Sequence, residues 1–424
     1  MLGADKIIEK KKEFLYPSSH KNHFYQNPPQ IVKGSMQYLY DDQGNQYLDF
    51  FAGVSVMNCG HCNPEILEAT ITQMQTLQHT TIIYLTEQMV QLAEKMAAIL
   101  PGDLRRSFFC CTGSEANEGA MLLARLYTGK NEFIALENGL HGRTYLTMSA
   151  TAIPMWRADP DLSPKIHFAQ SVWSSDYDLE KAAKESIESI KEIIQTRGAN
   201  NIAALMIEPI QGNGGIITPP SWYFKELKQL LEANEILLIV DEVQTGFART
   251  GKMFAIEHFD VVPDIMTVAK ALGNGMPISA FCATDEVASA FTKPSASTLG
   301  GNPVSSATAL AVLDYIEKYE LCQRSEELGT YLKEKLVDLQ GRYSIMKDVR
   351  GLGLMLGVEL VKENGEPATE ETDLILEKLK DRHVIVGKNG LNRNVLAFQP
   401  PLVITKENID ILINELETVL KELG

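Results

Sequence analysis

Short apolar runs alternate with longer amphipathic segments through the middle of the chain. Residues 115–127 and 179–195 have apolar positions at helical spacing. The short runs between such segments predict strands at residues 107–111, 133–136, 203–207, 236–240, 265–268 and 279–283. This alternation is typical of an α/β sheet that is mostly parallel and has helices on both faces.

The last part of the chain follows a different pattern. Helix-like residues 307–319 and 325–339 lead into the apolar stretch GLGLMLGVEL, and a helix at 371–382, short strands and a final helix from Lys406 follow. This order predicts a smaller α+β domain, which the strand-like residues 31–50 are expected to join. The expected division is an N-terminal segment of the small domain at 1–75, a large domain at 76–310 and the C-terminal part of the small domain at 311–424.

Charge and composition narrow the class of protein. The chain has 424 residues, of which 39 are basic and 55 acidic, so its formal net charge is −16. A chain this acidic is a poor candidate for binding nucleic acid or anionic membranes through its overall field. It contains no apolar run near membrane-spanning length, its first residues lack the apolar stretch of a signal peptide, and its six cysteines are too few for a disulfide framework. We therefore expect a cytoplasmic protein with no nucleic-acid or membrane partner.

Three local motifs point to other chemistry, and each is incomplete. CGHC at residues 59–62 has the thiol spacing of disulfide oxidoreductases, but the thioredoxin-type context is missing and no second pair of ligands completes a zinc site. GFARTGKM at residues 246–253 comes within one residue of a P-loop, but Met253 has no hydroxyl for Mg²⁺. GLGLMLG at residues 351–357 lacks a third glycine at the spacing that a dinucleotide fingerprint requires, and it runs into a predicted strand rather than a helix. We expect no metal site.

Four other features together fit one phosphorylated cofactor. Gly113 follows a predicted strand and opens a helix, whose free backbone N–H groups can bind phosphate. Asp241 ends a buried strand, where a carboxylate needs a partner such as a protonated pyridine nitrogen. Lys270 also ends a strand, where desolvation lowers a lysine pKa as Schiff-base chemistry requires. The glycine-rich loop at 297–303 offers a second phosphate contact. Taken singly, each feature could equally be a helix cap or a solvated loop residue.

Six motifs occur in the order SEANEGA, HGRT, EPIQGNGG, DEVQTGFARTGKMFA, AKALGNGMP and STLGGNP. Together they resemble the class III (ω-amino acid) aminotransferases, which use pyridoxal 5′-phosphate, and the resemblance runs from about Ile31 to the end of the chain. It implies a fold-type I transferase, with a large domain built on a mostly parallel seven-stranded sheet and a smaller α+β domain. It also implies a homodimer with shared active sites.

The resemblance implies roles for residues at the matching positions. Lys270 would form the Schiff base and then carry a proton between the substrate and the cofactor, and Asp241 would keep the pyridine nitrogen protonated. Gln244 would hydrogen-bond the 3′ oxygen of the ring, and Val243 would pack beneath it. The other expected cofactor contacts are Gly113 and Ser114 at the phosphate, Thr298 at the phosphate of a neighbouring subunit, His141, and Glu208, which in relatives can pair with a substrate-binding arginine.

Two positions depart from the family pattern. Leu140 stands where relatives usually carry an aromatic residue against the ring, so packing is expected from an aliphatic face or from His141. Ala397 in LAFQPPL stands where relatives that bind an α-carboxylate carry arginine. Losing that arginine removes charged hydrogen bonds worth about 1.5–3 kcal/mol each. Arg143 of HGRT is retained, and the expected substrate contacts are Arg143, Trp156 and Arg393.

These departures favour an ω-amine donor whose acidic group lies away from the amine, such as β-alanine, 4-aminobutyrate or a taurine-like molecule. The acceptor would be a 2-oxo acid, either 2-oxoglutarate held by Arg143 or pyruvate. An amino-acid racemase or epimerase of the same family is the alternative. A noncatalytic binding protein on a degenerate transaminase fold is a third hypothesis, against which the retained Lys270, Asp241 and Gln244 argue.

Overall fold

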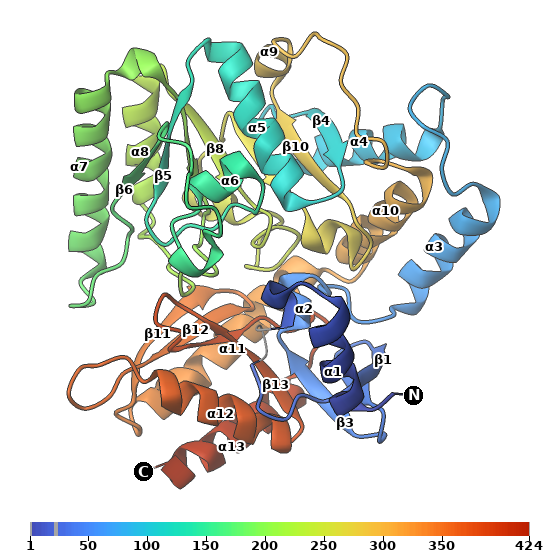
Figure 1. Cartoon of the computed structure of the whole chain (residues 1–424), viewed down its shortest axis with the longest axis vertical. Coiled ribbons are helices and arrows are strands. Elements are labelled where there is room, and N and C mark those ends of the chain that lie inside the picture. Colours follow the sequence, from blue (N-terminus) through green and yellow to red (C-terminus); the bar gives the residue numbers. More distant parts are fainter. Residues whose placement is uncertain (1, 21–23, 424) are drawn as a thin grey trace.

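A computed structural model describes residues 2–20 and 24–423, and its central feature is the sheet expected from the middle of the chain (Figure 1). The strand order is β4 (Arg106–Cys110), β10 (Ser279–Ala283), β9 (Ile265–Val268), β8 (Leu237–Asp241), β7 (Ile202–Ile207), β5 (Glu132–Leu136) and β6 (Ile166–Ala169). Only β10 runs antiparallel to its neighbours; the remaining pairs are parallel. The mostly parallel, seven-stranded sheet is therefore confirmed, and β6 is the strand that the apolar pattern missed.

Helices cover both faces of this sheet. Along β7, Leu205 and Ile207 join an apolar cluster with residues of α7 (Leu179–Arg197) and α8 (Tyr223–Glu232). The alternate residues Ala204 and Met206 join a second cluster with residues of α5 (Gly113–Thr128). Because successive strand residues point to opposite faces, α5 lies on the face opposite α7 and α8. Four more helices complete this part of the chain: α3 (Pro64–Thr76), α4 (Glu87–Ile99), α6 (Tyr145–Ala150) and α9 (Asp285–Ala288).

A second seven-stranded sheet joins the two ends of the chain. Its order is β1 (Ile31–Ser35), β2 (Tyr38–Asp41), β3 (Gln46–Phe50), β13 (Val384–Asn389), β14 (Val395–Phe398), β12 (Met355–Leu360) and β11 (Met346–Leu352). The link is the parallel pairing of β3 with β13, which Figure 1 shows as a blue strand beside a red one. The strands near residues 31–50 therefore share a sheet with those of the C-terminal region.

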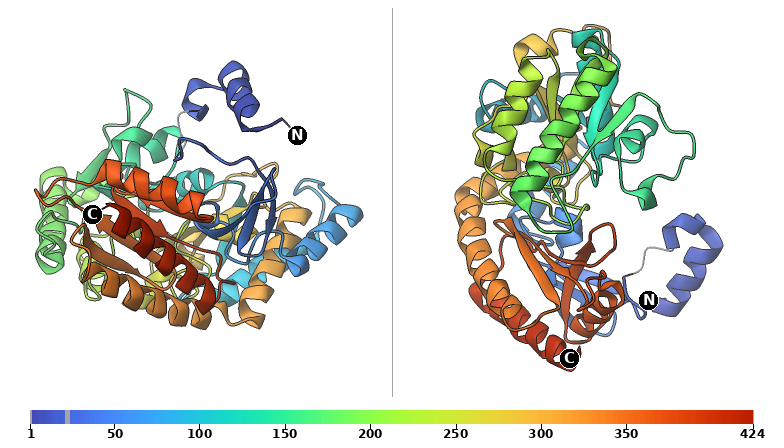
Figure 2. Two further views of the ribbon diagram at one scale, coloured as in Figure 1. Left: turned by 90° about the horizontal axis from the view of Figure 1, so that it is seen from below. Right: turned by 90° about the vertical axis from the view of Figure 1, so that its left-hand side faces the viewer.

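The C-terminal helices are α10 (Pro303–Lys318), α11 (Leu321–Gln340), α12 (Thr369–Asp381) and α13 (Lys406–Leu423). Two short elements flank the region between the sheets. One is α2 (Ala52–Ser55), and the other is α1 (Ala4–Phe14), which buries no residue and projects from the body in both views of Figure 2. The division at residues 75 and 310 remains a prediction. In residues 2–20 and 24–423, no helix is long and apolar enough to cross a membrane.

Candidate active site

A cavity of about 1080 Å³ lies at the carboxyl edge of the large sheet. Parallel strands end there together, which is where open α/β sheets place their ligands. Five strands contribute to its lining at or just after their carboxyl ends. The lining residues are Gly113 after β4, Leu140 after β5, Glu208 after β7, Asp241 at the end of β8 and Lys270 after β9. The second sheet contributes Ile385, Lys388 and Asn389 from the other side. The topology therefore brings the widely separated motifs into one site.

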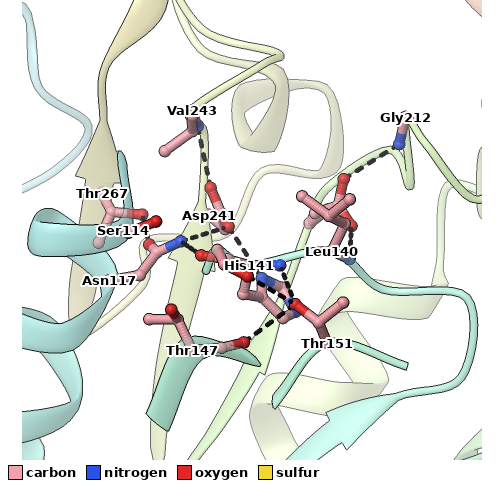
Figure 3. Close-up of polar contacts among 12 residues, drawn as sticks. Ser114, Asn117, Leu140, His141, Thr147, Thr151, Gly212, Asp241, Val243 and Thr267 are labelled. Carbon is pink, nitrogen blue, oxygen red and sulfur yellow. Dashed lines mark hydrogen bonds and ion pairs between the residues drawn. The ribbon is translucent and has the colours of Figure 1, made fainter. Parts of the chain in front are cut away.

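Asp241 is the centre of a buried hydrogen-bond network (Figure 3). Its Oδ2 accepts a hydrogen bond from Asn117 Nδ2 at 2.8 Å and lies 2.8 Å from His141 Nδ1. Its Oδ1 accepts from the Val243 N–H at 3.1 Å. Asn117 is itself held by Thr267, whose hydroxyl donates to Asn117 Oδ1 at 2.6 Å. These contacts fix the carboxylate at the end of β8, and among residues 2–20 and 24–423 no arginine or lysine forms an ion pair with it.

His141 is the titratable partner of Asp241. Burial lowers the pKa of the His141 imidazole, but the hydrogen bond and charge of Asp241 outweigh this effect and raise the pKa above its ordinary value. The backbone carbonyl of His141 also accepts from Asn117 Nδ2 at 2.6 Å. Sequence reasoning missed Asn117, because an asparagine in the first turns of α5 is equally common on a solvated helix face.

Glu208 follows β7 and lines the same cavity. Its Oε1 accepts the Leu140 N–H at 2.9 Å, and its Oε2 accepts the Gly212 N–H at 3.1 Å. Burial raises the pKa of this carboxyl to about 7, since the His141 charge and the two backbone donors only partly offset the cost of desolvation and the repulsion from Asp241. Among the described residues no arginine pairs with Glu208, and the expected pairing with a substrate-binding arginine remains a prediction.

Lys270 begins the 3₁₀ turn η5 (Lys270–Gly273) directly after β9. Its φ of +46° is unusual for a residue with a side chain, and such strain is typical of functional positions. Desolvation lowers the pKa of the Lys270 amine, although Asp241 and Glu208 act in the opposite direction. A lysine with a lowered pKa is uncharged more of the time at neutral pH, so its amine is free to act as nucleophile or proton acceptor more often than that of a solvated lysine.

The start of α5 has the form expected of a phosphate site. Thr112 and Glu115 form a capping box, which uses the Thr112 hydroxyl and the Glu115 carboxylate to satisfy other backbone donors. Gly113 and Ser114 line the cavity at the positive end of the helix dipole. The Ser114 hydroxyl accepts from the Arg143 N–H at 3.1 Å, which ties the HGRT segment to the helix start.

The residues present fit pyridoxal phosphate. Gln244 lines the cavity, and its buried Nε2 has no hydrogen-bond partner among the described residues, so it is available to a ligand oxygen. Val243 also lines the cavity and packs against Gly113, where an added Cβ would lie 3.0 Å from a Val243 methyl. Lys270, Asp241 and the helix start supply the amine, the acid and the phosphate donors. When bound, the cofactor supplies an electron sink for the substrate α-carbon.

The three expected substrate residues and the expected cofactor contact Thr298 lie in different places. Arg143, Trp156 and Arg393 all line the cavity, and Trp156 ends the 3₁₀ turn η2 (Pro154–Trp156). Thr298 does not: it is exposed, in a loop on the outside of its own chain, and a role there depends on a second subunit. The roles of these residues remain predictions.

The two departures have different structural settings. Leu140 lines the cavity beside His141. Ala397 is fully buried in β14, in an apolar cluster with Ile210, Ile216 and Met355, and does not line the cavity.

Sequence reasoning also missed an aromatic wall. Phe24, Tyr25 and Phe51 line the cavity from the N-terminal region. Their only sequence signal is aromatic character ahead of β1 and after β3.

CGHC is split between a buried Cys59 and an exposed Cys62, and the described part of the chain holds no group of side chains able to bind a metal ion.

Comparison with known proteins agrees with this site. A family model described as "Aminotransferase class-III" matches residues 20–420. "Alanine--glyoxylate aminotransferase 2 homolog 2, mitochondrial" of Arabidopsis thaliana is 42% identical over 99% of this chain and 88% of its own length. "Leucine/methionine racemase" of Thermococcus litoralis is 38% identical over 100% of this chain and 96% of its own length. The crystal structure of a transaminase from the marine bacterium Virgibacillus superposes with a TM-score of 0.91 at 30% identity, covering 99% of this chain and 100% of the other.

Proposed function

The chain belongs to the class III aminotransferases, and we propose that it transfers the amino group of an ω-amine bearing a remote acidic group to a 2-oxo acid. Donors of this class are β-alanine, 4-aminobutyrate and taurine-like molecules; 2-oxoglutarate and pyruvate are the acceptors considered. Glyoxylate, in the name of the Arabidopsis relative, is also a 2-oxo acid. The enzyme class and the cofactor follow from the family, whereas the donor is the proposal.

The observation that carries this proposal is the setting of Arg393. Its side chain lines the cavity, is partly buried, and has no hydrogen-bond or ion-pair partner among residues 2–20 and 24–423. Desolvation lowers the pKa of the guanidinium. A desolvated, unpaired guanidinium facing a cavity favours a carboxylate or sulfonate ligand, with which it can form paired charged hydrogen bonds.

The polar groups near the reacting centre have separate tasks. Lys270 accepts and returns the proton at the substrate carbon that bears the amine, and Asp241 with His141 and Asn117 keeps a hydrogen-bond acceptor fixed at the cofactor ring nitrogen. Arg393 lies on the loop between β13 and β14 of the second sheet, whereas Lys270 follows β9 of the large sheet, and both line the cavity. A donor whose acidic group lies away from its amine fits two groups that come from different sheets.

A homodimer with shared sites is part of the same proposal. The segment between α3 and α4 exposes Ile83 and Leu85, at 80% and 101% of their maximal areas. The 297–303 loop packs beside it, since an added Cβ at Gly301 would lie 2.9 Å from the sulfur of Met89 at the start of α4. An exposed apolar surface next to Thr298 supports a contact between subunits, through which Thr298 would reach the partner's phosphate site.

An activity matrix of amines against 2-oxo acids tests the donor proposal. We expect 4-aminobutyrate or β-alanine to be preferred over n-butylamine, which lacks the acidic group. Arg393→Gln should raise KM for the acidic amines by roughly tenfold to a hundredfold, since a charged hydrogen bond is worth about 1.5–3 kcal/mol, and leave KM for n-butylamine unchanged. Equal effects on both amines would refute the proposal.

A racemase is the second candidate, favoured by the relative from Thermococcus litoralis. Proton return to either face of the same carbon inverts an amino acid without consuming a keto acid. Incubation of one enantiomer of leucine or methionine without a 2-oxo acid separates the two functions. Inversion without amine transfer would replace the aminotransferase proposal.

A further inference from the structure

Residues 24–28 form a strap that runs along the second sheet and reaches into the cavity, where Phe24, Tyr25 and Pro28 are lining residues. The strap is not part of a helix or strand, so side chains from elsewhere must hold its backbone. Its anchor is on α12, outside the cavity.

Glu377 and Lys380 are that anchor. Glu377 Oε2 accepts the Gln26 N–H at 2.8 Å, and Oε1 accepts the Asn27 N–H at 3.3 Å. Lys380 Nζ donates to the Asn27 carbonyl at 3.2 Å and to Glu377 Oε1 at 2.7 Å. Lys380 is only 6% exposed. Glu377 is partly exposed, and Lys380 also forms an ion pair with the exposed Asp381. Together Glu377 and Lys380 satisfy three backbone groups of the strap and so fix its position.

Phe24 is where the strap meets the proposed anion site. The Arg393 guanidinium carbon lies 5.3 Å from the centre of the Phe24 ring, and Lys388 Nζ lies 5.7 Å from it. Lys388 is neutralised by an ion pair with Asp373, whereas Arg393 has no partner within the described chain. Phe24 also packs against Phe51, with ring centres 5.7 Å apart. The ring is therefore wedged between an aromatic neighbour and the free guanidinium.

We propose that Phe24 determines substrate specificity by orienting Arg393, and that Glu377 and Lys380 are positioning residues that hold Phe24 through the strap. The proposal rests on the function assigned to Arg393 above. The aromatic face limits the rotamers open to the guanidinium without occupying its N–H donors, so they stay available to a carboxylate or sulfonate. Lys388 also lies beside the Phe24 ring, so a positive charge in this place would not by itself require Arg393. The role proposed for Phe24 is therefore to orient the guanidinium.

The test is the ratio of KM for 4-aminobutyrate to KM for n-butylamine in the holoenzyme. Phe24→Leu removes the aromatic face but keeps an apolar side chain, and should raise this ratio by roughly threefold to tenfold, the range of a cation–π contact. Phe24→Trp keeps the face and should restore the ratio. Glu377→Ala removes no cavity atom and should raise the ratio in the same direction. Glu370→Ala, an exposed glutamate of the same helix, is its control.

Four outcomes decide the proposal. A raised ratio in Phe24→Leu and in Glu377→Ala, with kcat for n-butylamine preserved in Glu377→Ala, supports it. A parallel rise in KM for both amines shows a purely structural role and overturns it. If Arg393→Gln changes the ratio but the strap variants do not, the strap proposal alone fails. If Arg393→Gln leaves the ratio unchanged, the proposed donor class fails and the strap proposal with it. Should Phe24→Leu not fold, Glu377→Ala decides.

Discussion

We expect the free energy of unfolding of the cofactor-free protein to depend on pH through Glu208. The substitution Glu208→Gln should remove this dependence. The Glu208 carboxyl is buried beside Asp241 and is held only by two backbone N–H groups. Glu208→Gln keeps the size of the side chain and one acceptor but cannot ionise. The substitution leaves one backbone donor without its acceptor, which costs about 1–3 kcal/mol at every pH. The pH dependence, not the absolute stability, is therefore the informative quantity.

The sign and the size of the change in the free energy of unfolding with pH follow from the pKa of the Glu208 carboxyl. In the folded protein burial raises it to about 7, from 4.5 in the unfolded chain. Between these values the folded state holds a proton that the unfolded state has lost, so the free energy of unfolding falls as pH rises. The stabilisation is complete below about pH 4.5 and is lost by about pH 7. At 1.36 kcal/mol for each pH unit, the total change is about 3 kcal/mol.

Urea unfolding of both proteins, freed of cofactor, measures this change at several values between pH 5 and pH 8. The stability of the wild type should fall relative to Glu208→Gln by about 2–3 kcal/mol across that range. His141 is present in both proteins, so the difference between them isolates the substitution at residue 208. A difference that stays constant with pH would show that Glu208 is ionised throughout, and would refute the argument from desolvation.

Three further substitutions test other parts of the site. Asn117→Leu breaks the contacts to Asp241, His141 and Thr267 and should lower the free energy of unfolding by about 2–4 kcal/mol, measured by urea titration. Gly212→Ala would place a Cβ 2.1 Å from Gln244 Oε1 and so displace that side chain, weakening cofactor binding in a spectroscopic titration. Arg393 has a φ of +55°, so Arg393→Gly should raise the free energy of unfolding by about 1 kcal/mol while abolishing the preference for acidic amines. A less stable Arg393→Gly would mean that the residue serves the fold.

The sheet was predictable because its inner strands are buried on both faces and are therefore continuous apolar runs. All six residues of β7 are buried, for example. The strand that was missed, β6, lies at the edge and contains His167, whose ring pairs with Glu132 at 2.7 Å. A four-residue edge strand with a polar centre has no pattern that distinguishes it from a loop.

The reacting end of the site was predictable for a related reason. Lys270 and Asp241 are charged residues directly after buried strands, and such placement is costly unless it serves a ligand. Asn117 and Phe24 were not predictable, since each acquires its role only through partners distant in sequence. Asn117 is a buried helix residue because it faces Asp241. Phe24 lines the cavity on a strap whose backbone α12 holds at Gln26 and Asn27.

The position of Ala397 explains why a missing arginine cannot simply be restored. Ala397 pairs with Gly357 on one side and Gly387 on the other, so three neighbouring strands carry almost no side chain at this level. Large apolar groups fill the space: an added Cβ at Gly387 would lie 2.4 Å from the Phe51 ring, and one at Gly357 would lie 3.1 Å from Ile216. A guanidinium at position 397 would have to displace them.

A strand residue cannot move without disturbing its pairing, whereas the loop between β13 and β14 can accept a left-handed residue. Arg393 occupies that conformation, and its guanidinium reaches the cavity. On this loop the Arg393 side chain has no hydrogen-bond or ion-pair partner within the described chain. The Phe24 ring of the N-terminal strap contacts the guanidinium and limits its rotamers. We therefore propose that Arg393, ordered by Phe24, takes the place of an arginine on β14, so that donor specificity would depend on residues from both ends of the chain.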